Sequence, residues 1–115
     1  MKVLSMRYCT VESEASELQS FFDKLGLPRK SSAVSDASGA IYSAGESWIE
    51  VWQEGPDMPA GLMLQIIVDD ADAFAHHAQA NGLAPHGPVH AHGEKMYFLT
   101  SPSGLNVTIQ AQENS

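Results

Sequence analysis

The most chemically distinctive run in the sequence is Trp48-Ile49-Glu50-Val51-Trp52, in which two tryptophans flank a carboxylate at alternate positions. The β-branched residues between them predict a strand, whose successive side chains point to opposite faces. Both indole rings and the carboxylate therefore share one face. Aromatic rings beside an anion suit an organic cation, each well-placed ring contributing about 0.5–2 kcal/mol. The alternative is that Trp48 and Trp52 are packing residues and Glu50 is a solvent-exposed carboxylate.

Five histidines are the other candidates for chemistry. His76 and His77 are adjacent in a predicted helix, so their side chains diverge and do not converge on one ion. His90 and His92 have the spacing of residues on one face of a strand. Because no Cys or carboxylate stands at a matching metal-ligand spacing, we interpret His86, His90 and His92 as parts of a solvated edge strand, with a metal site as the alternative.

Charge and motifs exclude several classes of function. Six Lys and Arg against 14 Asp and Glu give a net charge of −8, and no Lys or Arg lies between Ser31 and Glu94. Nucleic acids and anionic membranes need clustered cations, so neither is an expected partner. A neutral or cationic small molecule is permitted, although acidity also simply keeps a small domain soluble. The sequence has no Gly-rich phosphate loop, Gly-x-Ser-x-Gly elbow or HExxH motif.

Cysteine content and hydropathy indicate a cytoplasmic protein. Cys9 is the single cysteine and has no internal disulfide partner. The N-terminal residues contain no uninterrupted apolar signal segment, and no apolar run approaches the roughly 20 residues that cross a bilayer.

An internal repeat organises the 115 residues, which fit one domain. Residues 6–12 and 63–69 are predicted strands at an offset of 57, and each is followed by a predicted helix that ends near a glycine, Gly26 or Gly82. Residues 48–52 lie opposite 106–110. Each half reads as a strand, a helix and three short strands, with module one at about residues 1–56, module two at about 61–112, and a linker over 55–61.

The helix predictions follow from apolar residues at helical spacing. Ser13 is the expected N-cap of the first helix and Asp70 that of the second. The residues predicted to face inward are Ala15, Leu18, Phe21, Phe22 and Leu25 in the first helix, and Ala71, Phe74, Ala75 and Ala78 in the second.

Together these features resemble the vicinal oxygen chelate superfamily, the group of glyoxalase I, extradiol dioxygenases and bleomycin-resistance proteins. The resemblance rests on four motifs in this order: Leu25-Gly26-Leu27 after the first helix, Ile49-Glu50-Val51 in a strand, Val68-Asp69-Asp70 before the second helix, and Ser101-Pro102-Ser103-Gly104 before the last strand. It implies an α+β fold in which two β-α-β-β-β modules form a curved mixed sheet, a cup that holds the ligand. It also implies a homodimer.

The resemblance places the metal-ligand positions of the superfamily's enzymes on Met6, Glu50, Met63 and Thr108. Among these, Glu50 alone is a good ligand for a divalent ion. We therefore expect no metal, no cofactor and no catalytic residue, as in the bleomycin-resistance branch, where protection works by sequestration. The alternative is a metal-dependent lyase, isomerase or dioxygenase that uses Glu50 and a histidine recruited from His90 or His92 with Zn, Ni, Fe or Mn. A third reading is a partner or regulatory module, for which an exposed apolar patch would be the sign.

The register implied for the first strand gives the expected lining of the cup, and Arg7 then faces the helix side, a poor place for a cation. A shift of one residue in that strand is the alternative. Cys9 is interpreted as a small buried apolar residue. His92 falls where relatives have a packing residue near the mouth of the cup. The candidate ligand-binding residues are Trp48, Glu50, Trp52, Tyr8, Met6, Met63, Gln65, Thr108 and His92.

Overall fold

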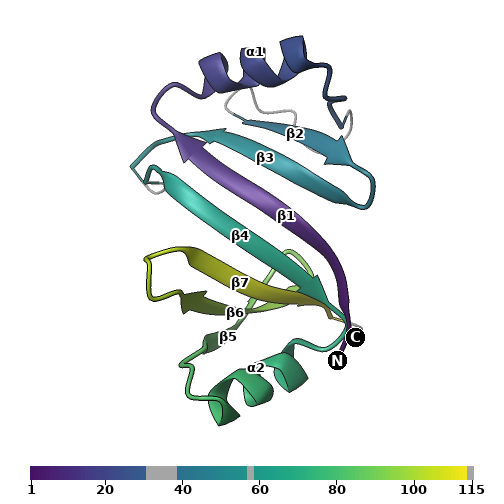
Figure 1. The fold of residues 1–115 in the computed structure, drawn as a ribbon, viewed down its shortest axis with the longest axis vertical. Helices are drawn as coiled ribbons and strands as arrows, with labels where there is room; N and C mark the ends of the chain where they lie inside the picture. Colours follow the sequence, from purple (N-terminus) through teal and green to yellow (C-terminus); the bar gives the residue numbers. More distant parts are fainter. Residues whose placement is uncertain (31–38, 57–58, 114–115) are drawn as a thin grey trace. The chain divides into compact units, whose positions relative to one another are not determined.

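A computed structural model describes residues 1–30, 39–56 and 59–113. Within them the chain forms seven strands and two helices (Figure 1). In chain order these are β1 (Val3–Glu12), α1 (Ala15–Leu25), β2 (Gly39–Ala44), β3 (Ser47–Gln53), β4 (Gly61–Val68), α2 (Ala71–Ala80), β5 (His86–Ala91), β6 (Glu94–Thr100) and β7 (Asn106–Gln112).

The chain forms two compact units. The first unit is Arg7–Leu62, and the second unit combines Met1–Met6 with Met63–Ser115. Two hydrogen bonds between Lys2 and Asp69 hold the N-terminal residues in the second unit. The Asp69 N–H donates to the Lys2 carbonyl oxygen at 3.1 Å, and the Lys2 N–H donates to the Asp69 side-chain carboxylate at 2.9 Å.

The first unit places α1 on one face of a small sheet. Its strands have the order β2-β3-β1, with β2 and β3 antiparallel and β1 and β3 parallel. The helix-facing residues form one apolar cluster: Ala15, Leu18, Phe22, Leu27, Ala40, Tyr42, Ile49 and Val51. Burial of these side chains holds the helix to the sheet.

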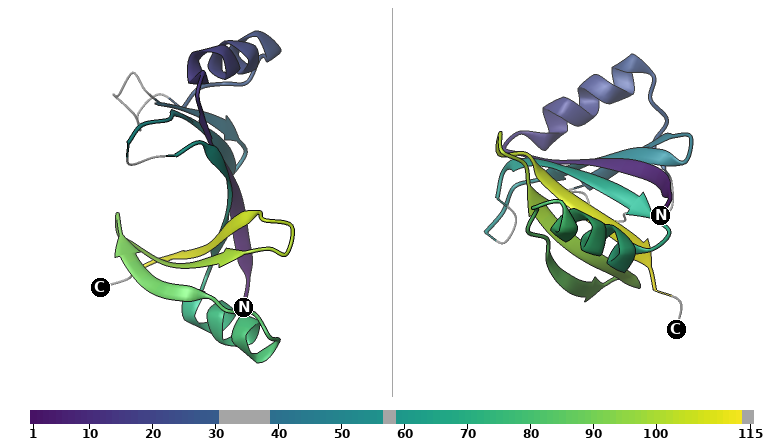
Figure 2. Two further views of the ribbon diagram at one scale, coloured as in Figure 1. Left: turned by 90° about the vertical axis from the view of Figure 1, so that its left-hand side faces the viewer. Right: turned by 60° about the horizontal axis from the view of Figure 1, so that its bottom comes forward.

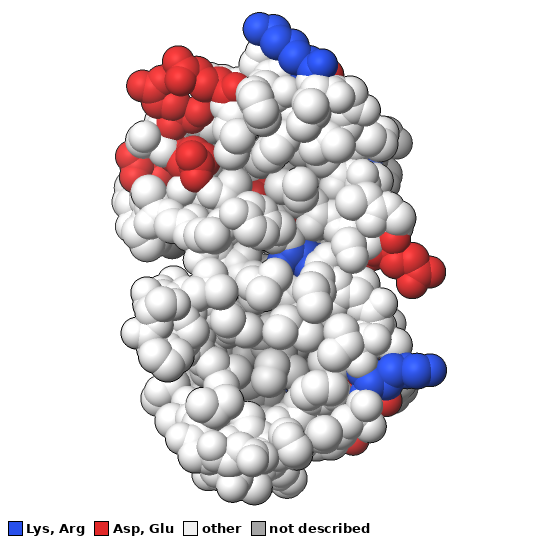
Figure 3. Space-filling model, in the orientation of Figure 1, with Lys and Arg blue, Asp and Glu red and all other residues white. Residues whose placement is uncertain are grey.

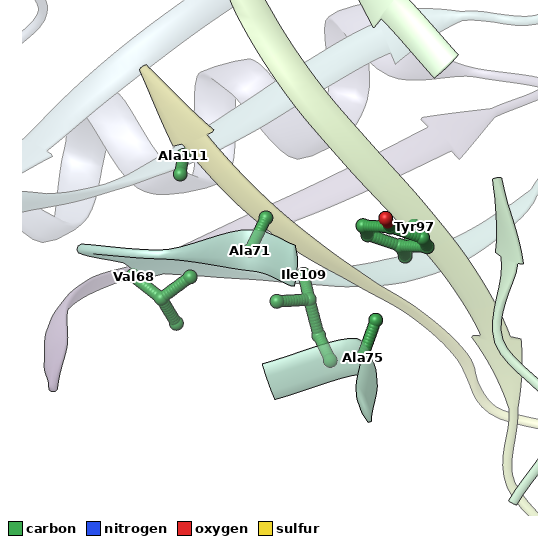
Figure 4. Close-up of a cluster of buried hydrophobic side chains, with 6 residues drawn as sticks. All are labelled: Val68, Ala71, Ala75, Tyr97, Ile109 and Ala111. Carbon is green, nitrogen blue, oxygen red and sulfur yellow. The ribbon is translucent and has the colours of Figure 1, made fainter. Parts of the chain in front are cut away.

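The second unit repeats this plan. Its strands have the order β4-β7-β6-β5, with β4 and β7 parallel and the other neighbours antiparallel. Figure 2 shows α2 lying along this sheet. The core beneath it, drawn in Figure 4, is Val68, Ala71, Ala75, Tyr97, Ile109 and Ala111, with Ile66, Phe74 and Leu99 packed against it.

Strand pairing confirms that the two halves share a repeated structure. Arg29 forms a single bridge with Tyr42 in the first unit. The equivalent pair in the second unit is His86 with Phe98, offset by about 57 and 56 residues. In the second unit three strands follow the helix, as predicted. In the first unit two strands follow it among the described residues, where three were predicted. Residues 31–38 and linker residues 57–58 lie outside the described residues.

The N-terminus of α2 is capped by a residue next to it in the sequence, whereas that of α1 is capped by a distant residue. Asp70 caps α2 as predicted, its carboxylate accepting from the Ala73 N–H at 3.1 Å. The prediction that Ser13 caps α1 is wrong. The side chain of Gln53, from β3, accepts from the Ala15 N–H at 3.2 Å and donates to the Ser13 carbonyl oxygen at 2.8 Å. A side chain from a distant strand therefore accepts from one backbone N–H at the start of α1, in place of the predicted serine cap.

The inward face of α1 is narrower than predicted. Phe21 and Leu25 are 59% and 63% exposed, so the prediction that they pack on the sheet is wrong. Leu18 and Phe22 make the contact instead. A sheet of three described strands offers room for a stripe one or two side chains wide, and residues at its margin remain in solvent.

Each helix is also tied to its sheet by a tyrosine, an aspartate and a cation. In the first unit the Tyr42 hydroxyl donates to the Gln19 carbonyl oxygen at 2.9 Å and to Asp23 at 3.1 Å, and Arg29 donates twice to Asp23, at 3.0 and 2.9 Å. The hydrogen bond from Arg29 lowers the pKa of the Asp23 carboxyl group.

In the second unit the corresponding acceptor is Asp72. It accepts from the Tyr97 hydroxyl at 2.5 Å and from Lys95 at 2.8 Å. The hydrogen bond from Lys95 lowers the pKa of Asp72.

Neither described helix is long and apolar enough to span a bilayer. Asp and Glu side chains gather on the surface near the start of α1 (Figure 3). There the carboxyl groups of Glu14 and Glu17 share a hydrogen bond, which raises the pKa of Glu17.

Candidate ligand-binding site

The sheet face opposite the helix is called the open face of each unit. On the open face of the first unit, the Glu50 carboxylate lies between two indoles: the Trp48 Nε1–H donates to Oε2 at 2.6 Å, and the Trp52 Nε1–H donates to Oε1 at 3.0 Å. The prediction that these three side chains share a face is confirmed. Each indole has one N–H donor, so these bonds fix both ring orientations. We call this group the Trp-Glu-Trp face.

Two of the chain's own cations lie over the ring of Trp48. The guanidinium carbon of Arg7 is 3.9 Å from the ring centroid, and Nζ of Lys30 is 4.2 Å from it. Both distances are within the range of cation–π attraction. The ring of Trp48 therefore already binds two cationic side chains of the protein itself.

Trp52 lies against the backbone of the neighbouring strand. It pairs with Gly39 across β2 and β3. A Cβ atom built on Gly39 would lie 2.3 and 2.4 Å from Cζ3 and Cε3 of Trp52. These distances are far below van der Waals contact, so the indole packs where a side chain at position 39 would otherwise be.

The register of β1 differs from the predicted one by one residue. Arg7 pairs with Trp48 and Cys9 with Glu50, which places both on the open face. Tyr8 pairs with Ile49, on the side of the helix. The expectation that Tyr8 lines the same face as Glu50 is therefore wrong. Met6 and Tyr8 are 48% and 44% exposed.

The physical reason for this register is the placement of Arg7. On the open face its guanidinium stacks on Trp48, whereas the predicted register would have directed it toward the helix. The repeat in this strand accordingly runs at an offset of 56, since Arg7 opposite Trp48 corresponds to Met63 opposite Asn106.

Cys9 is the strand neighbour of Glu50. Burial, and secondarily the negative charge of Glu50, raise the pKa of the Cys9 thiol to about 11. The thiol is therefore protonated near neutral pH and is a poor nucleophile and metal ligand. It fits the interpretation of Cys9 as a small apolar residue.

The open face of the second unit is polar. Thr108 donates to the Gln110 amide oxygen at 2.5 Å, and Gln110 donates to Glu94 at 3.1 Å. Thr108 and Gln110 are 1% and 2% exposed. Of the predicted residues, Gln65 pairs with Thr108, and Met63 pairs with Asn106, on this same face. The hydrogen-bonded chain includes Glu94, which sequence reasoning had not selected.

The predicted histidine pair does not form. β5 ends at Ala91, and His92 lies in the following turn with a φ of 53°, exposed to solvent. His90 contacts the carboxylate of Glu113 and pairs with Lys95. The expectation that His90 and His92 share one face of a strand is wrong, because the strand ends between them.

The donor set around Glu50 does not fit a divalent metal. Both carboxylate oxygens accept indole N–H groups, and the neighbouring thiol is protonated. Among the described residues no three or more His, Cys, Asp or Glu side chains are grouped to hold a metal ion. A separate cleft at the start of α2 is lined by Asp69, Asp70, Asp72, Lys95 and Glu113, and its lysine is already paired with Asp72.

Comparison with known proteins identifies the fold. No protein-family model matches the sequence, and a search of curated proteins found no match. A glyoxalase/bleomycin resistance protein/dioxygenase superfamily member from Vibrio splendidus 12B01 has a TM-score of 0.70 at 15% identity, over 96% of this chain and 100% of that one. An NAD-dependent benzaldehyde dehydrogenase from Legionella pneumophila has 0.68 at 11%, over 94% and 99%. The methylmalonyl-CoA epimerase from Mycobacterium tuberculosis has 0.63 at 13%, over 97% and 88%. At these identities the likeness shows the fold alone.

Proposed function

On the scaffold of an α+β glyoxalase/bleomycin-resistance-like fold, that of the vicinal oxygen chelate superfamily, we propose that this chain binds a small planar organic molecule on the Trp-Glu-Trp face without a metal. The observation that carries the proposal is the double hydrogen bond from Trp48 and Trp52 to Glu50. It holds two large aromatic surfaces in fixed orientations on a sheet face that no described helix of the first unit covers.

Preorganisation is what makes this face suitable for binding. A ligand that stacks on a freely rotating ring must first offset the loss of that ring's rotamer freedom, whereas a ring already bonded to Glu50 has lost it on folding. Indole rings offer a large apolar surface, and pockets for small organic molecules combine such surfaces with a few polar groups. Here the polar groups are a carboxylate and the guanidinium of Arg7.

Attraction of the ligand is proposed to come from ring stacking and not from charge. The sequence favoured an organic cation, but Arg7 and Lys30 already lie over Trp48. With two cations and one carboxylate on these residues, an added cation gains no electrostatic advantage. The proposal therefore covers uncharged planar ligands first.

The alternative of a metal-dependent lyase, isomerase or dioxygenase makes a separate prediction. It requires Glu50 to release at least one indole in order to bind a metal ion, and His90 to leave Glu113. Elemental analysis of tag-free protein tests it directly. Stoichiometric Zn, Ni, Fe or Mn that is lost in Glu50→Ala would contradict metal-free binding and favour the enzyme.

The test of binding uses three probes that share a ring and differ in charge: 4-nitrobenzyl alcohol, 4-nitrobenzoate and 4-nitrobenzylammonium. Isothermal titration calorimetry is expected to show saturable binding of the uncharged probe, and the Trp48→Ala/Trp52→Ala double variant should bind at least 10-fold more weakly. An equal affinity of the double variant, or no saturable binding of any probe, would contradict the proposal. Phe21→Ala, at an exposed aromatic residue on α1, is the control.

A homodimer in the cytoplasm, which the resemblance and the single cysteine favour, belongs to the same proposal. Light scattering coupled to gel filtration should give twice the mass of the chain at micromolar concentration. The mass of one chain would contradict it.

A further inference from the structure

The two indoles of the Trp-Glu-Trp face are not equivalent. We propose that Trp52, seated on Gly39, is the platform on which the ring of the ligand stacks, and that Trp48 is an internal anchor that does not touch the ligand. The inference rests on the proposed function and specifies it: one ring recognises the ligand, and a glycine on the neighbouring strand positions that ring.

Trp48 is excluded as the platform by what already lies on it. Arg7 and Lys30 are 3.9 and 4.2 Å from its ring centroid. A planar ligand that stacked on Trp48 would have to displace a cation and lose its attraction to the ring. The Trp48 N–H is also the shorter of the two bonds to Glu50, at 2.6 Å. Trp48 therefore holds the carboxylate and the two cations together.

Trp52 has a different environment. One side of its ring lies against Gly39, and its N–H donates to Glu50 at 3.0 Å. The side chain is half-buried, and in the described part of the chain no cation and no second aromatic ring stacks on it. We assign the ligand to the side of the indole that faces away from Gly39.

Gly39 is the positioning residue for this platform. Its backbone has no left-handed φ, so an alanine would be tolerated by the backbone itself. The obstacle is steric, because a methyl group would lie 2.3 Å from Cζ3 of Trp52. Room for the methyl group requires a shift of Trp52, and a shift of the ring alters its bond to Glu50. Gly39 therefore sets the tilt of the ring and, through Trp52, one of the two bonds to the carboxylate.

Ligand class follows from this geometry. A single ring platform recognises a flat apolar surface by stacking, which every aromatic ring offers, and it sets no strong demand on charge. The expected ligand is an uncharged or weakly charged aromatic molecule, and related probes should rank by ring area more than by net charge.

The test uses the two tryptophans as separate reporters, because the chain contains no others. Trp48→Phe leaves Trp52 as the reporter, and Trp52→Phe leaves Trp48. With 4-nitrobenzyl alcohol, Trp48→Phe should still show saturable quenching of Trp52 and should weaken binding less than Trp52→Phe does. Trp52→Phe should bind at least 10-fold more weakly than the wild type.

A pair of glycine variants tests the positioning role. Gly39→Ala should weaken binding at least 10-fold, whereas Gly55→Ala, at a glycine with no atom within 4 Å of the added methyl, should leave binding unchanged. In the Trp52→Ala background, Gly39→Ala should lose its effect on the midpoint of urea unfolding, since the clashing ring is gone. An equal destabilisation in both backgrounds would overturn the positioning role.

The outcomes separate the inference from the proposed function. If the wild-type protein binds no probe, the proposed function fails. If the wild-type protein binds, but Trp52→Phe keeps its affinity and Trp48→Phe loses it, the proposed function stands and the assignment of Trp52 as platform is overturned. Should Gly39→Ala fail to fold, the two single-tryptophan variants still decide between the rings.

Discussion

The first unit ties its helix to the sheet through Tyr42, Asp23 and Arg29, and the second unit does so through Tyr97 and two partners, Asp72 and Lys95. The aspartates occupy opposite ends of their helices, since Asp23 is near the end of α1 and Asp72 in the first turn of α2. A carboxylate is favoured electrostatically at the start of a helix and disfavoured at its end. The two hydrogen bonds from Arg29 to Asp23 therefore offset an unfavourable helix-end interaction, which Asp72 does not have.

The two open faces differ more than the two helix faces. Ile and Val residues on the central strands pack under both helices. On the opposite sides, the first unit presents two indoles around Glu50, and the second unit a chain of hydrogen bonds from Thr108 through Gln110 to Glu94. Packing thus constrains the helix faces of the repeat to stay alike, while the open faces are free to diverge, and the binding surface is assigned to the aromatic one.

The largest expected effect comes from the tie between α1 and its sheet. Tyr42 is fully buried and donates to two acceptors, so Tyr42→Ala should lower the free energy of unfolding by about 3–5 kcal/mol. Tyr97→Ala should cost less, because Tyr97 is 9% exposed whereas Tyr42 is fully buried. Urea unfolding followed by circular dichroism measures both. A larger loss of stability in Tyr97→Ala than in Tyr42→Ala would contradict this prediction.

Removing one hydrogen-bonding side chain from the centre of each open face should have an intermediate effect on the free energy of unfolding. Glu50→Ala leaves two indole N–H groups without their acceptor and should destabilise the protein by about 1–3 kcal/mol, with a shift in tryptophan emission. Thr108→Val removes one hydroxyl and should cost about 1 kcal/mol with no emission change. Unchanged emission in Glu50→Ala would mean that the carboxylate does not orient the indoles.

Removing the side chain that caps each helix should lower the free energy of unfolding by about 1 kcal/mol. The capping residues of the two units differ in type. Asp70→Ala removes the side-chain cap of α2, and Gln53→Ala removes the cap that β3 supplies to α1. Ser13→Ala is the matched control and should change the free energy of unfolding by less than about 0.5 kcal/mol, as an uninvolved surface change does. A loss of about 1 kcal/mol in Ser13→Ala would restore the serine as the cap.

The smallest expected effects concern the dependence of stability on pH below about 4. The pKa values of Asp23 and Asp72 are lowered in the folded state by hydrogen bonds from their cations. The stability that each contributes is complete above the unfolded pKa of about 4 and is lost as the pH falls through the lower, folded pKa. Asp23→Asn and Asp72→Asn should each make stability fall less steeply below about pH 4. An acid profile identical to that of the wild type would show that neither pair stabilises the fold.

Sequence patterns predicted what local periodicity determines. The alternation in residues 48–52 assigned Ile49 and Val51 to the core and the two tryptophans to the open face, as the structure shows. In the second unit the same alternation placed Ile66 and Val68 beneath the helix. These outcomes depend on the two-residue period of a strand and need no knowledge of distant contacts.

The wrong predictions concern features that depend on a contact with a residue far away in the sequence. In β1 the predicted repeat offset of 57 differs by one residue from the observed 56, and a shift of one residue exchanges the two faces of a strand. The observed register allows Arg7 to contact the ring of Trp48, which is about 40 residues away in the sequence. Gln53 replaces the expected cap at Ser13 over a similar separation. Gly39 did carry a readable signal, since glycine inside a strand often marks close approach of another group.

The most direct test of the central claim, that the ligand binds the aromatic open face and not the polar one, is a titration of ¹⁵N-labelled protein with 4-nitrobenzyl alcohol. Two tryptophans give two indole N–H resonances, which Trp48→Phe and Trp52→Phe assign. The Trp52 resonance is expected to shift with saturation and the Trp48 resonance to shift less. Stationary indole resonances, with shifts confined to backbone amides of residues 106–110, would contradict the claim.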